Sequence, residues 1–421
     1  MARRIGIRGR KVVAVVNDNT QISSSSDIKY ISVGPNLERL SDRDLFEKVV
    51  VRNGVPWISG EPKPVSELRI ACVGAWGIPC GISTYAEALW PRMWEKVADW
   101  RLFPEANTCQ PTTNIIPGLW KRGESLSALA KAIEDFQPDA VFIQHEYGIF
   151  PDARHWLSFI ARIREFRPIV TMHSVYHHKD KTVIENSIPE IVVHSRLAKD
   201  VLVQEKGIKS KVTVIKHGCG PSAASRLWNL YRSEHTFMQF GFGFRYKNWE
   251  APIRAAAILK HNYPDVFFTG LFSEGMFSKL EHDRYYDELM KLAFELGVED
   301  HIAILRGYVS ESCLNAYLGT NQVAVFPYLS DPDHVVYGAS GASRRAMEAQ
   351  IPVIVSREPH FCDLDGICPQ AESPEALAHE LAILFENPNL KAKLIEDQNR
   401  FLTENSWGKA GDLHLDLVSK P

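Results

Sequence analysis

The sequence predicts an α/β protein made of two Rossmann-like domains that face each other across a cleft, preceded by an N-terminal extension. From Leu68 onward, short apolar runs alternate with helical segments, which is typical of a parallel sheet covered by helices. This alternation restarts after a polar, Gly- and Pro-containing break at 218–225. With 421 residues, 45% of them hydrophobic, the chain is long enough to bury the cores of two or three domains.

The composition narrows the class of protein. The net charge of −3 lacks the basic excess of a nucleic-acid-binding protein. Basic residues gather only at the start (Arg3, Arg4, Arg8, Arg10 and Lys11), where we expect a solvated tail rather than an anion-binding patch. The seven cysteines form no CxxC pair, which argues against a disulfide framework and fits a reducing compartment. No apolar run approaches the ~18 residues of a membrane span, so we expect a cytoplasmic protein, with peripheral membrane contact left open.

The predicted domains follow from the restart of the pattern. Residues 1–66 form an extension and linker, 67–218 the first domain, 219–400 the second, and 401–421 a helix that crosses back towards the first. In the extension, 42–58 could form a helix and a strand.

The elements follow in order. In the first domain we expect strands at 68–74, 139–145, 168–174, 188–195 and 211–218, and helices at 83–97, 151–166 and 196–207. Pro91 is expected to interrupt the first of these helices. In the second domain we expect strands at 236–243, 266–272, 301–307, 323–329 and 351–356, and helices at 248–263, 284–297, 342–350 and 373–405.

A glycine-rich turn, "VGAWGIPCGISTYAEAL", links the first strand to the first helix. Gly74 and Gly77 follow the strand and Gly81 precedes the helix, so a ligand can approach the backbone where a helix N-terminus favours anions. The spacing is not the GxGxxG of a dinucleotide site, and a simple tight turn is the alternative.

Two motifs of the second domain also suit phosphate groups. "FGFGFRYKN" places Arg245 and Lys247 just beyond a strand, although a solvated loop is the alternative interpretation. "YGASGASRRAMEAQ" opens a helix, and the backbone N–H groups of Ser340, Gly341 and Ala342 can bind phosphate oxygens.

Three histidines, His145, His173 and His217, end apolar strands. Sites in doubly wound sheets lie beyond the carboxyl ends of the strands, so we weigh a functional role evenly against a structural one. Neither HExxH nor CxxC is present, and we expect no metal site.

Taken together and in order, these motifs resemble a family: the retaining GT-B glycosyltransferases of family four, the mannosyl/glucosyltransferase-like group. The resemblance covers roughly residues 68–415 and includes "IQHEYGIF", "PIVTMHSVY", "VIKHG" and "NSW". It implies transfer of a sugar from a nucleotide-diphosphate donor to an acceptor hydroxyl, with retention and without a metal or cofactor. It also implies an acceptor-side first domain and a donor-nucleotide second domain.

The resemblance implies roles for particular residues. Gly81 would approach the donor diphosphate, and Lys247, with Arg245 nearby, would hold it. His173 would face the sugar at the reaction centre and His145 would line the acceptor side. The diphosphate would also accept hydrogen bonds from the backbone of Ser340, Gly341 and Ala342.

The chain departs from the family pattern at the donor helix. Two glutamates eight residues apart are usual there, but Tyr337 and Arg345 occupy these positions, and Phe242 stands where a basic residue is usual. Glu348 is one helical step from Arg345 and would substitute for the second glutamate.

Other functions and several acceptors stay open. A GT-B sugar-nucleotide epimerase, a phosphorylase and a non-catalytic sugar-nucleotide-binding protein are the alternatives. A carbohydrate, a lipid-linked intermediate, a small polyol and a nucleic acid all remain candidate acceptors, and the sequence does not give the donor sugar, the base or the oligomeric state.

Overall fold

The computed structural model describes residues 63–106, 108–179, 188–221, 234–274, 279–330 and 335–419, and the backbone of three short strands nearer the N-terminus. These strands, β1 (Arg3–Gly6), β2 (Val12–Val16) and β3 (Ile28–Ser32), form one small sheet. The helix and strand expected at 42–58 lie outside the described residues.

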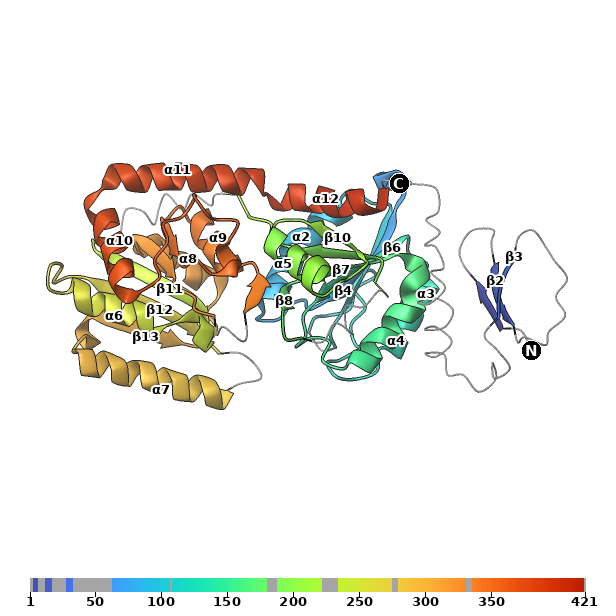
Figure 1. The fold of residues 1–421 in the computed structure, drawn as a ribbon, viewed down its shortest axis with the longest axis horizontal. Helices are drawn as coiled ribbons and strands as arrows, with labels where there is room; N and C mark the ends of the chain where they lie inside the picture. The colour runs from blue at the N-terminus through green and yellow to red at the C-terminus, as the bar shows by residue number, and fades with distance from the viewer. Residues whose placement is uncertain are drawn as a thin grey trace. The chain divides into compact units, whose positions relative to one another are not determined.

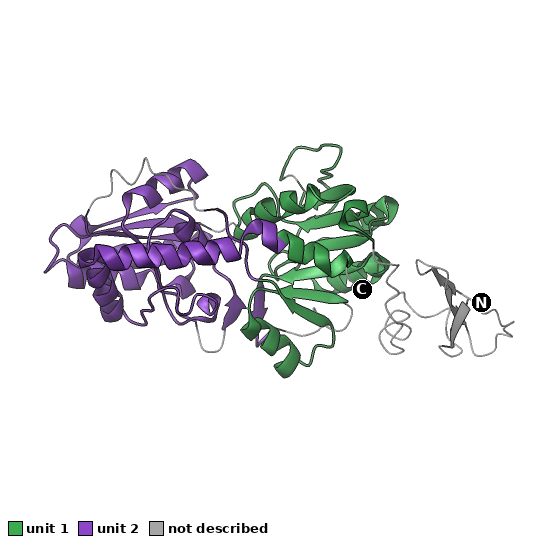
Figure 2. Ribbon diagram, turned by 90° about the horizontal axis from the view of Figure 1, so that it is seen from above, with its two compact units in different colours: residues 1–173, 179–215, 411–421 green, residues 174–178, 216–410 purple. Residues whose placement is uncertain are grey.

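The chain divides into two compact units (Figure 2). Unit 1 consists of Met1–His173, Lys179–Ile215 and Gly411–Pro421, and unit 2 of Ser174–His178 and Lys216–Ala410. Neither unit is a continuous stretch of sequence. The division into 67–218, 219–400 and 401–421 stays a sequence-based prediction.

Unit 1 contains a six-stranded parallel sheet in the order β10-β9-β7-β6-β4-β5. Figure 1 labels β4, β6, β7 and β10 of this sheet. The strands are β4 (Arg69–Gly74), β5 (Asp99–Pro104), β6 (Ala140–His145), β7 (Pro168–Met172), β9 (Glu190–Val193) and β10 (Lys211–Val214). Every residue of β6 and β7 is buried, as expected for central strands of a parallel sheet with both faces covered.

Four helices follow strands of this sheet: α2 (Gly81–Trp94), α3 (Ser127–Phe136), α4 (Ala153–Ile163) and α5 (Arg196–Asp200), the last continued by a π-helical turn, Val201–Glu205. The connections β4–α2–β5 and β6–α4–β7 run in opposite directions across the sheet. Because such connections are right-handed, α2 and α4 cover opposite faces.

Unit 2 contains a five-stranded parallel sheet in the order β13-β12-β11-β14-β16. The strands are β11 (Thr236–Phe242), β12 (Phe267–Ser273), β13 (Ile302–Arg306), β14 (Val323–Phe326) and β16 (Val353–Val355). The helices are α6 (Glu250–Leu259), α7 (Lys279–Leu296), α8 (Glu311–Thr320), α9 (Gly341–Glu348), α10 (Pro374–Glu386) and α11 (Pro388–Glu404).

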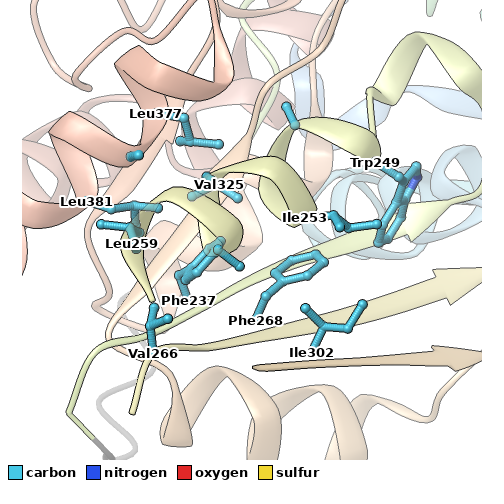
Figure 3. Packing of buried hydrophobic residues seen from close by; sticks show 14 of the residues in the cluster. Phe237, Trp249, Ile253, Leu259, Val266, Phe268, Ile302, Val325, Leu377 and Leu381 are labelled. Atoms are coloured by element: carbon cyan, nitrogen blue, oxygen red, sulfur yellow. The ribbon is translucent and has the colours of Figure 1, made fainter. Parts of the chain in front are cut away.

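Alternate residues of β11 enter different cores of unit 2, as the two-residue period of a strand requires. Phe237 packs with Trp249, Ile253 and Phe268 on the face covered by α6, α7 and α10 (Figure 3). Met238, its neighbour in sequence, belongs to the second cluster, which includes side chains of α8, α9 and α11. The sheet is therefore buried on both faces.

Two elements lie at places where the chain passes from one unit to the other. The strand β8 (Ser174–Tyr176) directly follows β7 and His173, yet it pairs antiparallel with β15 (Val336–Gly338) inside unit 2. The final helix, α12 (Trp407–Ser419), begins in unit 2 and ends in unit 1. In unit 1 its end buries Leu415 and Val418, and the Leu417 and Val418 carbonyls accept hydrogen bonds from Arg167.

The structure confirms the alternating α/β pattern. It adds strands and helices that the sequence did not predict, namely β1, β2, β3, β5, α3, α8, β8 and β15. The expected interruption at Pro91 is wrong, because α2 runs through it to Trp94. A proline costs this helix only one backbone hydrogen bond and some strain. Burial of Trp90 and Met93 on either side offsets that cost.

Candidate active site

The strand order locates the candidate site in unit 1. The connections diverge between β4 and β6, and ligands of doubly wound sheets bind beyond the carboxyl ends of the strands at such a point. The glycine-rich turn follows β4, while Gln144 and His145 end β6. His173 directly follows the next strand, β7.

The glycine-rich turn is held in shape by a carboxylate of α2. Glu87 Oε1 accepts hydrogen bonds from the Gly77 N–H at 2.8 Å and the Ser83 hydroxyl at 2.7 Å. Gly77 has φ +70°, and a Cβ there would lie 2.8 Å from the Thr108 carbonyl oxygen. The turn therefore requires glycine at this position.

Gly81 stands at the open end of this turn, as the first residue of α2. An added Cβ would meet no heavy atom within 4 Å, and the preceding Cys80 makes no side-chain cap. By contrast, Asp152 and Ser195 cap α4 and α5 with side-chain oxygens. The first N–H groups of α2 thus offer an uncapped, positively polarised helix end, which suits the predicted contact with an anion.

His173 is held by its neighbour on β6. Its Nε2 lies 2.7 Å from Gln144 Oε1, and an amide oxygen can only accept, so the proton is on Nε2 and Nδ1 is an acceptor. The ring also meets Tyr85 edge-on, with centroids 4.7 Å apart. Burial, followed by the neighbouring His194, lowers the pKa of His173 well below its usual value. His173 is therefore a neutral hydrogen-bonding group near pH 7.

His145 lies deeper than its predicted role suggests. Its side chain is fully buried, and its ring packs against Tyr147, Phe150 and Trp156. Burial lowers its pKa to about 3. Contact between this ring and an acceptor would require the surrounding aromatic side chains to move, and the acceptor-side role stays a prediction.

The strand order of unit 2 indicates a second candidate site, where the connections diverge between β11 and β14. Lys247 lies in the turn Arg245–Lys247 after β11, and Tyr328 lies two residues beyond β14. The two meet, with the Lys247 ammonium 5.3 Å from the centre of the Tyr328 ring. Gly241 makes room for this ammonium, because a Cβ there would lie 2.6 Å from Lys247 Nζ.

Lys247 carries a buried charge that no carboxylate in the described part of the chain neutralises. Its side chain is only 8% exposed, and no Asp or Glu oxygen of the described residues lies within 4.0 Å of its ammonium. Buried charges in proteins are normally paired. The missing partner points to an anionic ligand at this position.

The N-terminus of α9 is linked to the same place. The Tyr328 hydroxyl lies 3.2 Å from Ser340 Oγ, which caps α9 by accepting from the Ser343 N–H. The N–H groups of Gly341 and Ala342 are in the first turn, where a helix offers no backbone acceptor. Lys247 and the start of α9 are thus connected through Tyr328.

The guanidinium of Arg245 is engaged by carboxylates of α7. It donates to Glu281 at 2.9 Å and to both carboxylate oxygens of Glu288 at 2.7 and 2.9 Å, and it lies over the Tyr285 ring. A role in holding a diphosphate would compete with these bonds, and it stays a prediction.

The residues at the departures from the family pattern are engaged within unit 2. Glu348 accepts a hydrogen bond from the Gly220 N–H and pairs with Arg345, whose guanidinium also contacts Glu311 and Asn315. Burial raises the pKa of Glu348, partly offset by the Gly220 N–H and Arg345. The Tyr337 hydroxyl bonds to His177 across the β8–β15 pair.

One further group could hold a metal ion within the residues that the structure describes. Single ligand atoms of Glu234, His235 and Asp265 lie within 4.8 Å of one another. His235 directly precedes β11, so this group is at the amino end of the sheet, opposite the edge that carries Lys247. It has no part in the candidate site.

The chain is similar to known proteins in its fold rather than in its sequence. No family model matches the chain, and no curated protein sequence is significantly similar to it. Solved structures are similar, and three of them are named here. HepE from Anabaena in complex with UDP has a TM-score of 0.61 at 13% identity, over 84% of this chain and all of that chain.

The other two are trehalose-phosphate synthases. The enzyme from E. coli bound with UDP-2-fluoro glucose has a TM-score of 0.63 at 11% identity, over 84% of this chain and 99% of that chain. The UDP-forming synthase from Burkholderia xenovorans has a TM-score of 0.65 at 13% identity, over 84% and 100%. These likenesses confirm the predicted GT-B fold class.

None of the helices in the described part of the chain has the length and apolar character needed to cross a bilayer.

Proposed function

We propose that this protein is a glycosyltransferase that moves a hexose from a nucleotide-diphosphate donor to an acceptor hydroxyl, with retention of configuration. The observation that carries the proposal is the buried ammonium of Lys247, which pairs with no carboxylate of the described residues and is linked through Tyr328 to the N-terminus of α9. The GT-B fold and the order of the sequence motifs support it. UDP-sugars are the first donors to test, because HepE and the E. coli synthase were solved with UDP and a UDP-sugar analogue.

In the proposed reaction, the bond between the sugar C1 and the diphosphate oxygen breaks while the acceptor oxygen bonds to C1. Negative charge then grows on the leaving diphosphate. Lys247 and the N–H groups of Gly341 and Ala342 stabilise that charge more in the transition state than in the ground state. The acceptor proton passes to the departing phosphate oxygen.

The groups that unit 1 contributes to the proposed reaction carry no full charge. The uncapped start of α2 at Gly81 provides a further site for the donor's charge. His173, with its proton on Nε2 bound to Gln144, offers Nδ1 as an acceptor for a sugar hydroxyl. Because this imidazole is neutral, it orients the sugar without opposing the positive charge that develops at C1.

Lys247→Met tests the proposal. Methionine keeps most of the apolar stem and removes the charge, so we expect turnover of UDP-glucose to fall about 10²–10³-fold, the loss typical of one transition-state donor. The measurement is the initial rate of UDP release in the presence of an acceptor panel of sugars and sugar phosphates.

Lys260→Met is the matched control. Lys260 follows α6 and donates to the Leu296 and Gly297 carbonyls at the end of α7, and it is not part of the candidate site. We expect its rate to stay near that of the wild type. Full activity in Lys247→Met would contradict the assignment of the donor site.

The products distinguish the alternatives. Conversion of the nucleotide-sugar without any acceptor would indicate an epimerase, and consumption of inorganic phosphate would indicate a phosphorylase. Tight binding of UDP-, GDP- or ADP-sugars without turnover over the whole acceptor panel would indicate a binding protein.

A further inference from the structure

Unit 2 contains a buried histidine, His360, near the candidate site. His360 lies in the 3-10 turn Pro359–Phe361, a few residues beyond the carboxyl end of β16. Its side chain is 7% exposed, and its Nδ1 is buried without a hydrogen-bond partner. Nε2 is not enclosed in this way, so it is the ring nitrogen that a ligand can reach.

His360 lies in the same cluster as Lys247. Its ring stacks on Tyr246, with centroids 5.6 Å apart and planes 9° from parallel, and it meets the Tyr328 ring edge-on at 5.5 Å. The Lys247 ammonium lies over that Tyr328 ring. These residues extend from the carboxyl ends of β11, β14 and β16, which are neighbouring strands of the sheet.

The electrostatic surroundings keep this imidazole neutral. Burial lowers the pKa of His360 to about 3, and the positive charges of Lys247 and Arg344 add to the effect. A neutral imidazole has one N–H. Because a buried N–H without a partner is less tolerated than a buried unpaired acceptor, the proton belongs on Nε2 rather than on the buried Nδ1.

We propose that His360 is a substrate-binding residue whose Nε2–H donates a hydrogen bond to an oxygen of the donor's diphosphate, beside Lys247. This inference rests on the proposed function. A neutral donor adds a hydrogen bond to the anion without placing a second full positive charge near Lys247 before the anion binds. A purely structural role leaves unexplained why a polar ring, rather than phenylalanine, packs against Tyr246 and Tyr328.

His360→Phe tests the proposal in the full-length protein, since phenylalanine keeps the stacking and removes the N–H. We expect the dissociation constant for UDP, measured by calorimetry, to rise about tenfold, as for a lost hydrogen bond to a charged group. His360→Gln, which keeps an N–H donor, should recover part of the affinity.

His282→Phe is the matched control. His282 is also a buried histidine of unit 2, packed against Phe244 and Phe272, and we expect UDP to bind this variant as it binds the wild type. If His360→Phe and the wild type bind UDP equally, the role of His360 is wrong while the proposed function stands. If the wild type binds none of the UDP-, GDP- and ADP-sugars, the proposed function itself fails.

The wild-type protein provides a second readout that does not depend on a variant's folding. The ¹⁵N signals of the His360 ring, assigned by their absence in His360→Gln, should shift when UDP is added. They should not shift when UDP is added to Lys247→Met at the same concentration. His360 signals that UDP leaves unmoved in the wild type would overturn the proposal.

Discussion

Lys247 and Gly241 show how a single pair of residues can define a binding site. The ammonium occupies the space that a side chain at 241 would fill, and Gly241 itself has φ +135°, a backbone conformation that other residues rarely adopt. Gly241 is therefore needed both for this backbone conformation and for the position of the Lys247 ammonium.

Gly241→Ala should displace the ammonium and strain the backbone. We expect unit 2 to lose about 1–3 kcal/mol of stability, the usual cost of a residue held in a sparsely populated conformation. The affinity for UDP should fall as well, because the Cβ would lie 2.6 Å from Lys247 Nζ. Urea unfolding and calorimetry with UDP measure the two effects.

Gly366→Ala is the control that introduces backbone strain without a steric clash of the new Cβ. Gly366 has φ +72°, but an added Cβ there would meet no atom within 4 Å. This variant should lose stability and still bind UDP normally. A Gly241→Ala protein with normal UDP affinity would show that the position of the ammonium does not matter for binding.

At the scale of single residues, the strand-end rule predicted much of the candidate site but not all of it. Lys247 and His173 follow recognisable strands closely, so the sequence could place them. The sequence pattern does not single out Tyr328 as a site residue, although it lies at the end of a predicted strand. It does not single out His360 either, because this residue follows an irregular segment after β16. Tyr328 matters because the Lys247 ammonium lies over its ring, and His360 matters because its ring packs against Tyr246 and Tyr328. No local pattern encodes these contacts.

At the scale of elements, α9 depends on a buried ion pair. Arg344, which is 1% exposed, donates to both oxygens of Asp363 at 2.7 and 2.6 Å and to the Ser340 carbonyl at 3.0 Å. The pair thus anchors the first turn of the helix that carries the Gly341 and Ala342 N–H groups.

Arg344→Met should destabilise unit 2 by about 3–5 kcal/mol, because it leaves the Asp363 carboxylate buried without a partner. The double variant Arg344→Met/Asp363→Leu should recover part of this loss, since it removes the unpaired charge. Urea unfolding of the three proteins measures the difference. A double variant less stable than Arg344→Met would show that the charge of Asp363 is satisfied elsewhere.

Some helices and strands could be predicted from the sequence and others could not. Long apolar runs such as β6 and β11 were recognisable. The edge strand β5, "DWRLFP", begins with half-buried residues and has no such run. The strands β8 and β15 have three residues each, and they exist because two distant segments pair. Long-range pairing of this kind leaves no signal in either segment alone.

Buried neutral histidines make both units sensitive to acid. The pKa values of His145 in unit 1 and His360 in unit 2 are lowered to about 3. The unfolded chain takes up these protons near pH 6.5, whereas the folded units do not. The contribution of these two groups to the free energy of unfolding is therefore constant above about pH 6.5, and it decreases as the pH falls towards 3.

At pH 5 each of these histidines should cost about 2 kcal/mol relative to pH 7. Urea unfolding at the two pH values, followed separately for each unit, measures the loss. His145→Phe should reduce the pH dependence of unit 1 and leave that of unit 2 unchanged. An unaltered pH dependence of unit 1 in this variant would show that His145 is protonated in the folded state.

The interleaving of the chain has a consequence for biosynthesis. Unit 1 is built mostly from the first half of the sequence, but it also contains Gly411–Pro421. The ribosome adds these residues only after the whole of Lys216–Ala410. At roughly 5–20 residues per second, the nascent first unit waits on the order of 10–40 s for its final helical segment. During that interval the surface that Leu415 and Val418 later cover is open to chaperones and to neighbouring nascent chains.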